Sequence, residues 1–230
     1  MKRILIASAL VPLVLVMAGS QAAEKPAAAQ SIPTASTAPV PAGAYTLDKA
    51  HGSLLFRVNH LGFSHWTARF KKFDAQLQFD SVDATKSSVT VTVDPKSIAS
   101  DNAPEGFMAT LAGPEWLNAG KFPQMTYRST KVERIGTNDL RINGELTLHG
   151  VTKPVALVAS YNGGYAGHAY DPHARIGFSA TGTLKRSDFG VAYGIPAPGA
   201  TMGVFDDVEV IIEAEFSGPP LAGAAAPAKP

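Results

Sequence analysis

The sequence predicts a mostly β protein, a closed antiparallel β-barrel of about eight strands with one or two short helices at its side or mouth. Apolar residues recur at every second position through most of residues 45–216, which is the period of a strand with one buried face. Glycine and proline separate these stretches, and only one segment has helical spacing. Closing the sheet into a barrel leaves no free strand edge.

Residues 1–22 are expected to be a signal peptide. Lys2 and Arg3 precede an apolar run, and small residues around Ala22 offer a cleavage site. We therefore expect cleavage near Ala22 and export to the periplasm. The chain has 20 basic and 19 acidic residues. Cleavage removes two of the basic residues, Lys2 and Arg3, so the exported part is nearly neutral.

Two flanking segments, 23–43 and 218–230, are rich in alanine and proline. Such segments cannot bury enough apolar surface to order themselves, so we expect both to be disordered. This leaves residues 44–217 as one domain with a substantial core. The chain has no cysteine, which excludes disulfides and thiolate metal sites. It has no basic run of the kind that binds nucleic acid.

The first alternating stretch, 45–80, is predicted to form one long, bent strand pair. Strand parity places Leu54, Phe56, Val58 and His60 on one inner face, and the turn follows at Gly62. The apolar rhythm then shifts by one position after Phe70. Since a one-residue slip turns every side chain to the other face, we expect a bulge at 71–72.

Six further stretches carry the same period of two. They are 89–93, 125–127, 140–148, 155–159, 176–180 and 208–216. Residues 103–118 instead place apolar residues three and four positions apart, which predicts one or two short helices interrupted at Gly113. Two loops rich in glycine and proline, 163–172 and 193–202, are expected to be mobile and to border an opening.

The sequence predicts no catalytic site and no metal site. The six histidines form no HxH or HxxxH pair, and no nucleophile elbow or phosphate-binding loop is present. The motif 186–190 has two interpretations. Arg186 or Asp188 contacts the head group of a ligand, or Arg186 pairs with a carboxylate while Ser187 or Asp188 caps a turn. We favour the structural role. The motif His149 to Pro154 is interpreted first as a hairpin turn.

The predicted barrel interior leaves two alternatives open. An eight-stranded barrel is either filled by its own side chains or holds one slender ligand. Small inward residues alternate with aromatic ones, which permits a narrow tunnel. The small residues are Ala68, Ala75, Ala159, Ala180, Gly182 and Ala214.

Several motifs together resemble one known family. They are Tyr45-Thr46-Leu47-Asp48 with His51, His60-Leu61-Gly62, Arg69-Phe70, Phe122-Pro123, Gly144 to Val155, Arg186 to Gly190, and Val208-Glu209-Val210. The chain is similar over about 45–216 to the YceI-like proteins, a polyisoprenoid-binding periplasmic family. It departs from the family pattern at Gly52 and Ala68, where one small residue replaces another.

The resemblance implies a lipocalin-like barrel that carries a long-chain amphiphile, most plausibly an isoprenoid quinone or polyprenyl lipid, and is not an enzyme. We expect this ligand rather than a cofactor or metal. The predicted ligand-binding residues are Phe56, Val58, His60, Phe63, Phe70, Phe73, Leu77, Phe79, Val91, Phe107, Leu111, Trp116, Tyr127, Leu146, Phe178, Asp188 and Phe189. Polar groups at the mouth, among them His60 and Asp188, would orient the head group.

Two other functions compete with this prediction. The first is a periplasmic enzyme that acts at the barrel mouth with His60 as general base beside Asp188. The second is a stress-response interaction protein whose barrel is filled by its own side chains. The sequence leaves open whether two chains pair and whether the carrier meets the membrane or a membrane protein.

Overall fold

The computed structural model describes residues 39–168 and 170–221. The expected signal peptide, most of the 23–43 segment and residues 222–230 lie outside the described residues. The strands are β1 Gly43–Leu47, β2 Ser53–His60, β3 Ser64–Phe70, β4 Phe73–Phe79, β5 Ser88–Val93, β6 Ile98–Ala99, β7 Met125–Arg134, β8 Asp139–Leu148, β9 Val151–Tyr165, β10 His173–Lys185 and β11 Val204–Pro220. The helices are α1 Phe107–Leu111 and the 3₁₀ turns η1 Ala84–Lys86, η2 Pro95–Ser97 and η3 Arg186–Phe189.

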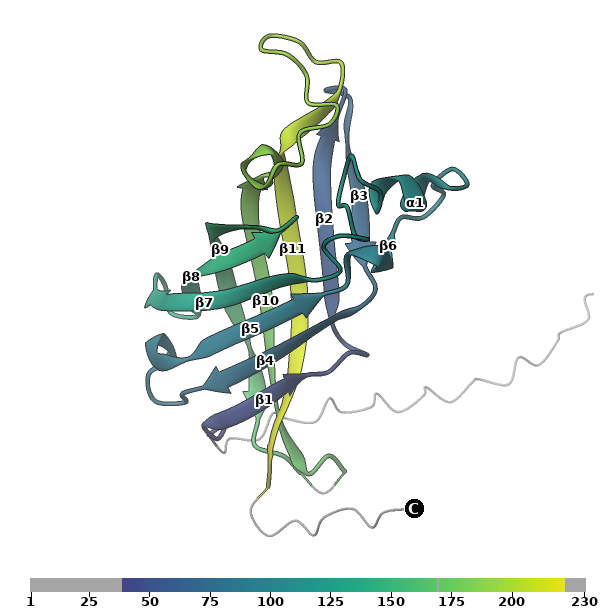
Figure 1. Ribbon diagram of the computed structural model, residues 1–230. Helices are drawn as coiled ribbons and strands as arrows, with labels where there is room; N and C mark the ends of the chain where they lie inside the picture. The colour runs from purple at the N-terminus through teal and green to yellow at the C-terminus, as the bar shows by residue number, and fades with distance from the viewer. Residues whose placement is uncertain (1–38, 169, 222–230) are drawn as a thin grey trace, which may run out of the picture. The chain divides into compact units, whose positions relative to one another are not determined.

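Eight of the strands form a closed antiparallel barrel in the order β1, β4, β5, β7, β8, β9, β10, β11 (Figure 1). Pairing of Leu47 in β1 with Phe216 in β11 completes the ring. The predicted barrel is confirmed. Among the described residues, no helix has the length and hydropathy needed to span a membrane.

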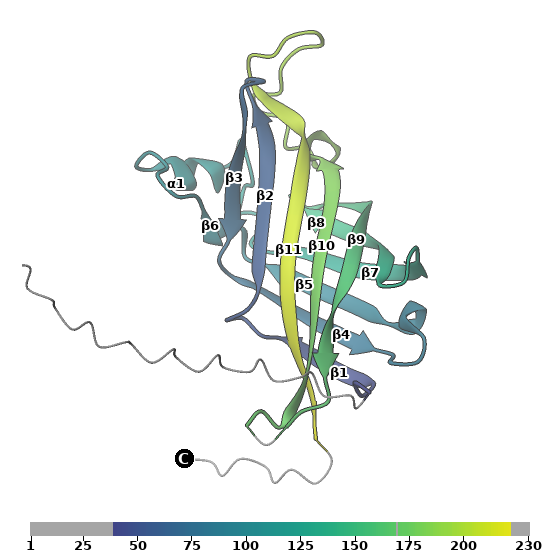
Figure 2. The same cartoon turned by 180° about the vertical axis from the view of Figure 1, so that it is seen from behind.

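The β2–β3 hairpin lies outside this ring, which corrects the expectation that it forms part of the barrel. β11 is 17 residues long. Its C-terminal part pairs with β1, while its N-terminal part pairs with β2, as in the partners Val210 and Phe56. β3 and β6 then extend the sheet (Figure 2). We call β2, β3 and β6 the ribbon.

The shift in apolar rhythm after Phe70 has a different cause from the expected bulge. β3 ends at Phe70 and β4 begins at Phe73, with a bend between them. β3 pairs with β2 and β6, whereas β4 pairs with β1 and β5. The rhythm changes because the chain leaves the ribbon and enters the barrel, so the two stretches belong to different strands.

The segment 103–118 supplies one short helix. Five residues form α1, and turns follow from Ala112, since proline at 114 cannot continue the helical hydrogen bonding. Leu111 of α1 is buried with Ala68 and Ile98 of the ribbon. α1 therefore lies beside β3 and β6, at the side of the barrel (Figure 1).

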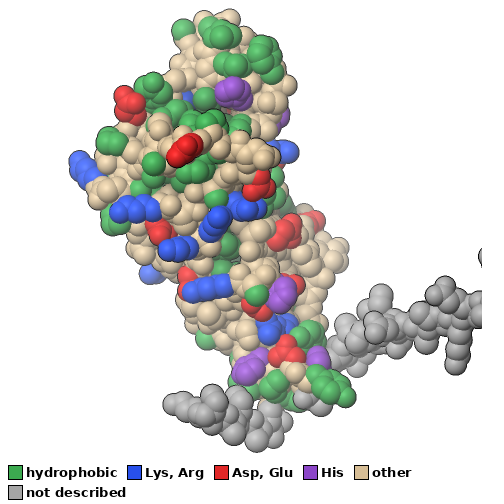
Figure 3. Space-filling model, turned by 90° about the vertical axis from the view of Figure 1, so that its right-hand side faces the viewer, with side chains coloured by type: hydrophobic (Ala, Val, Ile, Leu, Met, Phe, Trp, Pro, Cys, Tyr) green, Lys and Arg blue, Asp and Glu red, His purple; other side chains and the backbone are tan. Residues whose placement is uncertain are grey.

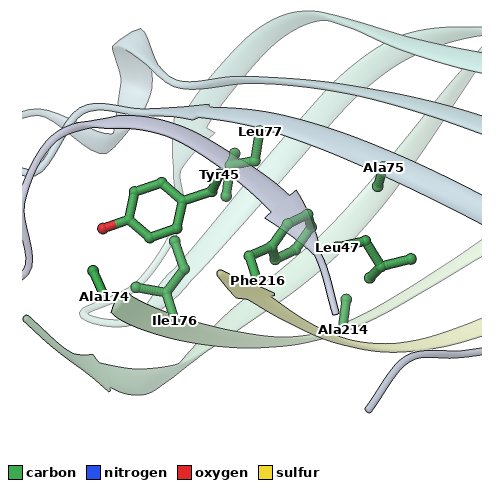
Figure 4. Packing of buried hydrophobic residues seen from close by; sticks show 8 residues of the cluster. All are labelled: Tyr45, Leu47, Ala75, Leu77, Ala174, Ile176, Ala214 and Phe216. Atoms are coloured by element: carbon green, nitrogen blue, oxygen red, sulfur yellow. The ribbon is translucent and has the colours of Figure 1, made fainter. Parts of the chain in front are cut away.

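One end of the barrel is closed by packed side chains. The cluster there comprises Tyr45, Leu47, Ala75, Leu77, Ala174, Ile176, Ala214 and Phe216 (Figure 4). The Tyr45 hydroxyl donates to the carbonyl oxygen of Pro41 at 2.7 Å. A Cβ on Gly218 would lie 2.0 Å from the Tyr45 ring. Glycine therefore lets β11 pass over this ring and continue to Pro220, past the domain end expected at 217.

We predict that Gly144→Ala destabilises the barrel by about 1–3 kcal/mol, as overpacking does. The new Cβ would lie 2.4 Å from Cζ of Tyr127 and 2.6 Å from the backbone oxygen of Arg128, and the backbone oxygen cannot move aside. Gly120→Ala is the control, because nothing lies within 4 Å of a Cβ there. Urea unfolding measures both, and equal stability of the two variants would contradict the prediction.

Candidate functional site

A narrow cavity of about 110 Å³ lies inside the barrel. Alternate residues of β4, from Phe73 to Phe79, line it, so it extends about 20 Å along that strand at the usual rise per residue. Its other walls come from β5 and from β7 to β11, with one residue each from β1, β2 and η1. The full lining is Leu47, Leu54, Phe73, Ala75, Leu77, Phe79, Ala84, Ser87, Ser88, Val89, Val91, Tyr127, Val132, Leu140, Ile142, Leu157, Ala159, Phe178, Ala180, Ile212, Ala214 and Phe216.

The lining is almost entirely apolar. Only Ser87, Ser88 and Tyr127 carry polar side-chain atoms. The Ser87 hydroxyl accepts from the backbone amide of Asp80 at 3.0 Å. The Tyr127 hydroxyl donates to the carbonyl oxygens of Ile142 and Val155, at 2.9 and 3.2 Å. Burial raises the pKa of Tyr127 to about 12, so it stays neutral. The cavity therefore offers a ligand dispersion and apolar burial, with no charge.

Small residues create the empty space. Leu140, Ala159, Ala180 and Ile212 face one another in a row across β8 to β11. The two alanines in the middle of this row leave room between the larger residues. The cavity is still smaller than the roughly 300 Å³ or more of an ordinary small-molecule site. A long chain therefore enters only if lining side chains, above all the aromatic rings, change rotamer.

A wider groove of about 480 Å³, with charged side chains beside a mostly apolar wall, adjoins the cavity where the ribbon leaves the barrel. Leu54 and Phe73 line both spaces. The groove brings together four basic residues and two acidic ones, namely Lys49, Arg69, Lys71, Lys72, Asp74 and Asp94. Lys49 pairs with Asp74 at 2.7 Å. Arg69 pairs with Asp101 at 3.2 Å, so the groove offers the ammonium groups of Lys71 and Lys72 beside one side of an apolar interior.

The predicted ligand-binding residues are distributed over several parts of the fold. The cavity is lined by Phe73, Leu77, Phe79, Val91, Tyr127 and Phe178. Phe70 lines the groove. Phe56, Phe107, Leu111 and Trp116 pack between the ribbon and α1, while Leu146 and Phe189 pack with Val93 and Met125 at the other end of the barrel. Val58 is buried in β2.

His60, Phe63 and Asp188 are placed differently from the prediction. All three are exposed, and Phe63 is 82% exposed. Strand parity holds for β2, but its end projects beyond the barrel, so His60 has no interior to face. Phe63 lies in the turn that follows. Asp188 lies in η3, whose inward residues are Arg186 and Phe189.

Several lining residues were missed from the sequence. Ala84 and Ser87 come from the turn between β4 and β5, and Ser88 is the first residue of β5, so no alternation marks them as inward residues. Val132 and Leu140 flank the turn between β7 and β8. Leu140 belongs to the predicted stretch 140–148, whereas Val132 lies beyond the stretch 125–127. Which end of each strand meets the cavity depends on strand register, and a sequence does not show register.

Arg186 holds a loop together from within. It is buried, and its guanidinium donates to the carbonyl oxygens of Phe205, Val191, Tyr193 and Val204 at 2.6–3.0 Å. Its partners are thus backbone oxygens and not the expected carboxylate. Its guanidinium also lies 5.3 Å from the ring centre of Trp116. Ser187 instead donates its amide and hydroxyl to Asp206. The structural interpretation of this motif is the one the contacts support.

One group of side chains has the composition of a metal site. Asp48, His51 and Glu215 bring their ligand atoms within 4.8 Å of one another. Asp48 is already bonded to His51 at 3.0 Å and pairs with Arg175. Hydrogen bonds from His51, from the backbone amide of Ala50 and from Arg175 lower the pKa of Asp48 to about 2. The carboxylate is therefore engaged in ion pairs that join β10 to the loop after β1.

Comparison with known proteins assigns the family. The model of the YceI-like domain matches residues 45–216, so the chain belongs to the YceI-like family. A UPF0312 protein of Shewanella putrefaciens is 41% identical over 160 residues, which are 67% of this chain and 81% of that protein.

Two solved structures share the fold. The Campylobacter jejuni YceI protein is 30% identical with a TM-score of 0.60, over 70% of this chain and 90% of its own. A domain from Saccharophagus degradans described as polyisoprenoid binding is 14% identical with a TM-score of 0.53, over 76% of this chain and 98% of its own. At that identity the second likeness shows the fold alone.

We predict that Arg186→Met loosens the loop between η3 and β11. Four carbonyl oxygens lose their donor, and each buried acceptor left without one costs about 1 kcal/mol or more unless the loop opens to water. Amide exchange of residues 190–204, followed by mass spectrometry, should become faster. Lys185→Met is the control, because its exposed pair with Asp207 contributes little. Unchanged exchange in the Arg186 variant would contradict this role.

Proposed function

We propose that this protein binds a long-chain isoprenoid lipid in its barrel and carries it through the periplasm. The observation that supports this is the cavity, whose lining has only three polar side chains. The YceI-like fold and the description of the Saccharophagus degradans domain as polyisoprenoid binding support the same ligand class. Export by the expected signal peptide would place the carrier between two membranes.

Apolar burial supplies sufficient affinity without any charge pair. Each methylene group removed from water contributes about 0.8 kcal/mol. Twenty buried carbons would therefore contribute on the order of 15 kcal/mol before ordering costs. Part of this free energy is used to rotate side chains out of the narrow cavity. The barrel thus exchanges contacts among its own residues for contacts with the ligand.

The groove beside the cavity is the proposed place for the head group of the ligand. It adjoins the cavity at Leu54 and Phe73, and Lys71 and Lys72 lie beside these two residues in the fold. Ammonium groups donate hydrogen bonds to carbonyl and to phosphate oxygens alike. The groove therefore fits either a quinone ring or a phosphate, and both belong to the proposed ligand class.

We favour binding over catalysis. The enzyme alternative would use His60 as general base beside Asp188, but both side chains are exposed and neither lines the cavity or the groove. Substrate held in the barrel would lie away from both of them.

The direct test is to identify what the protein binds. The protein is purified from cells that naturally produce it, extracted with organic solvent, and the extract is analysed by mass spectrometry. We expect a prenyl lipid near one molecule per chain, and we expect added prenyl quinone or prenyl phosphate to raise the melting temperature of the emptied protein. An empty protein that neither lipid stabilises would refute the proposal.

We predict that Ala159→Leu blocks the cavity. Ala159 is buried and lines the cavity, so the three added carbons occupy the space of the ligand, at a cost in folding free energy of about 1–3 kcal/mol. Extracted lipid should fall several-fold. Ala156→Leu is the matched control, since Ala156 is exposed on the same strand. Equal lipid content of the two variants would place the ligand elsewhere.

A further inference from the structure

Two loops far apart in the sequence form one end of the molecule. The turn between β2 and β3 lies against the loop between η3 and β11 (Figures 1 and 2). The backbone amide of Leu61 donates to the carbonyl oxygen of Gly203 at 2.9 Å, and His60 pairs with Val204. We call residues 61–65 and 191–203 the apolar tip.

The apolar tip exposes large hydrophobic side chains. Phe63 is 82% exposed, Met202 is 73% exposed and Tyr193 is 53% exposed. Between Val58 and Trp66, and between Phe189 and Phe205, the sequence has no Asp, Glu, Lys or Arg. Figure 3 shows hydrophobic and uncharged atoms at the upper end, with charged side chains lower down.

The loop that carries Tyr193 and Met202 is held in a defined conformation. Four hydrogen bonds from the buried Arg186 bind its two ends, and the amide of Val204 donates to the carbonyl oxygen of Gly194 at 2.9 Å. The fold thus uses a buried guanidinium to present these side chains to solvent. Exposed hydrophobic side chains that gather in one place mark interaction sites, whereas single ones are ordinary, so the apolar tip calls for an explanation.

A band of charged residues lies directly below the apolar tip. Lys185 pairs with Asp207 at 2.9 Å, and Arg57 pairs with Glu209. A convex, uncharged end above a charged band has the polarity of a bilayer interface, where hydrocarbon gives way to polar groups. Phenylalanine, tyrosine and methionine enter such an interface without leaving a charge unpaired. Protein interfaces instead usually carry a polar rim and arginine within the contact.

We propose that the apolar tip docks on the surface of a lipid bilayer and inserts Phe63 and Met202 between the lipids. The proposal rests on the proposed function, since a carrier of prenyl lipid has to meet the membrane that holds its cargo. Because the tip has no Lys or Arg, binding should depend on apolar burial and not on anionic lipid. This sets it apart from peripheral proteins held by basic clusters.

The test is flotation of the full chain with vesicles of phosphatidylcholine, alone or mixed with phosphatidylglycerol, at low and high salt. Wild-type protein should float with both vesicles, with little dependence on salt. Phe63→Ser combined with Met202→Ser should weaken binding at least about tenfold, because two large apolar side chains are lost from the inserted surface. Val82→Ser combined with Tyr170→Ser is the control, as those residues are 94% and 96% exposed in other turns.

Three flotation results would overturn the proposal: the wild type does not float, the tip variant floats as well as the control, or flotation requires phosphatidylglycerol and disappears at high salt. Light scattering tests whether the tip binds a second copy of the chain instead. A wild-type dimer that is absent in the tip variant would assign the tip to that contact and overturn the proposal. Lipid extracted from the tip variant separates the two hypotheses, because the barrel of that variant is intact and should still contain prenyl lipid.

Discussion

The pairing of β11 with two different partners is the constraint on which the rest of the structure depends. Its C-terminal part pairs with β1 and closes the barrel, and its N-terminal part pairs with β2 and starts the ribbon. Because β1 leaves the edge of β11 after Leu47, β2 can occupy the same edge further along. The cavity, the groove beside it and the projecting apolar tip all follow from this division of one strand edge.

The proposed carrier role sets two opposing requirements for the barrel. A carrier has to fold when it is empty, and for that its inner residues must pack against one another. It also has to yield space to a long chain. Alanines at the middle of the wall and aromatic rings around them meet both needs, since rings rotate within a fixed backbone while the alanines keep the central space open. A cavity of about 110 Å³ is what remains when the rings fill the interior.

The sequence predicted much of the fold and a smaller part of the site. Strict alternation identified most of the barrel strands, and it identified Phe73, Leu77 and Phe79 as inward residues because period two fixes the face of each strand. It did not show that the β2–β3 hairpin leaves the barrel, since a ribbon buried on one face has the same pattern. His60 was misplaced for that reason. Ala84, Ser87 and Ser88 reach the cavity because of how the chain turns before β5, which no alternation shows. The position of Arg186 was not predictable because its partners are backbone carbonyl oxygens, which every residue carries.

If an isoprenoid chain occupies the barrel, the inner wall has to move apart to hold it. A crystal structure of the protein purified with its lipid is the decisive measurement. We expect continuous density for the chain between Leu54 and Ser88, with rings such as Phe79 and Phe178 in new rotamers and the head group near Lys71 and Lys72. Density for the chain outside the barrel, with the inner side chains packed as they are here, would contradict the account.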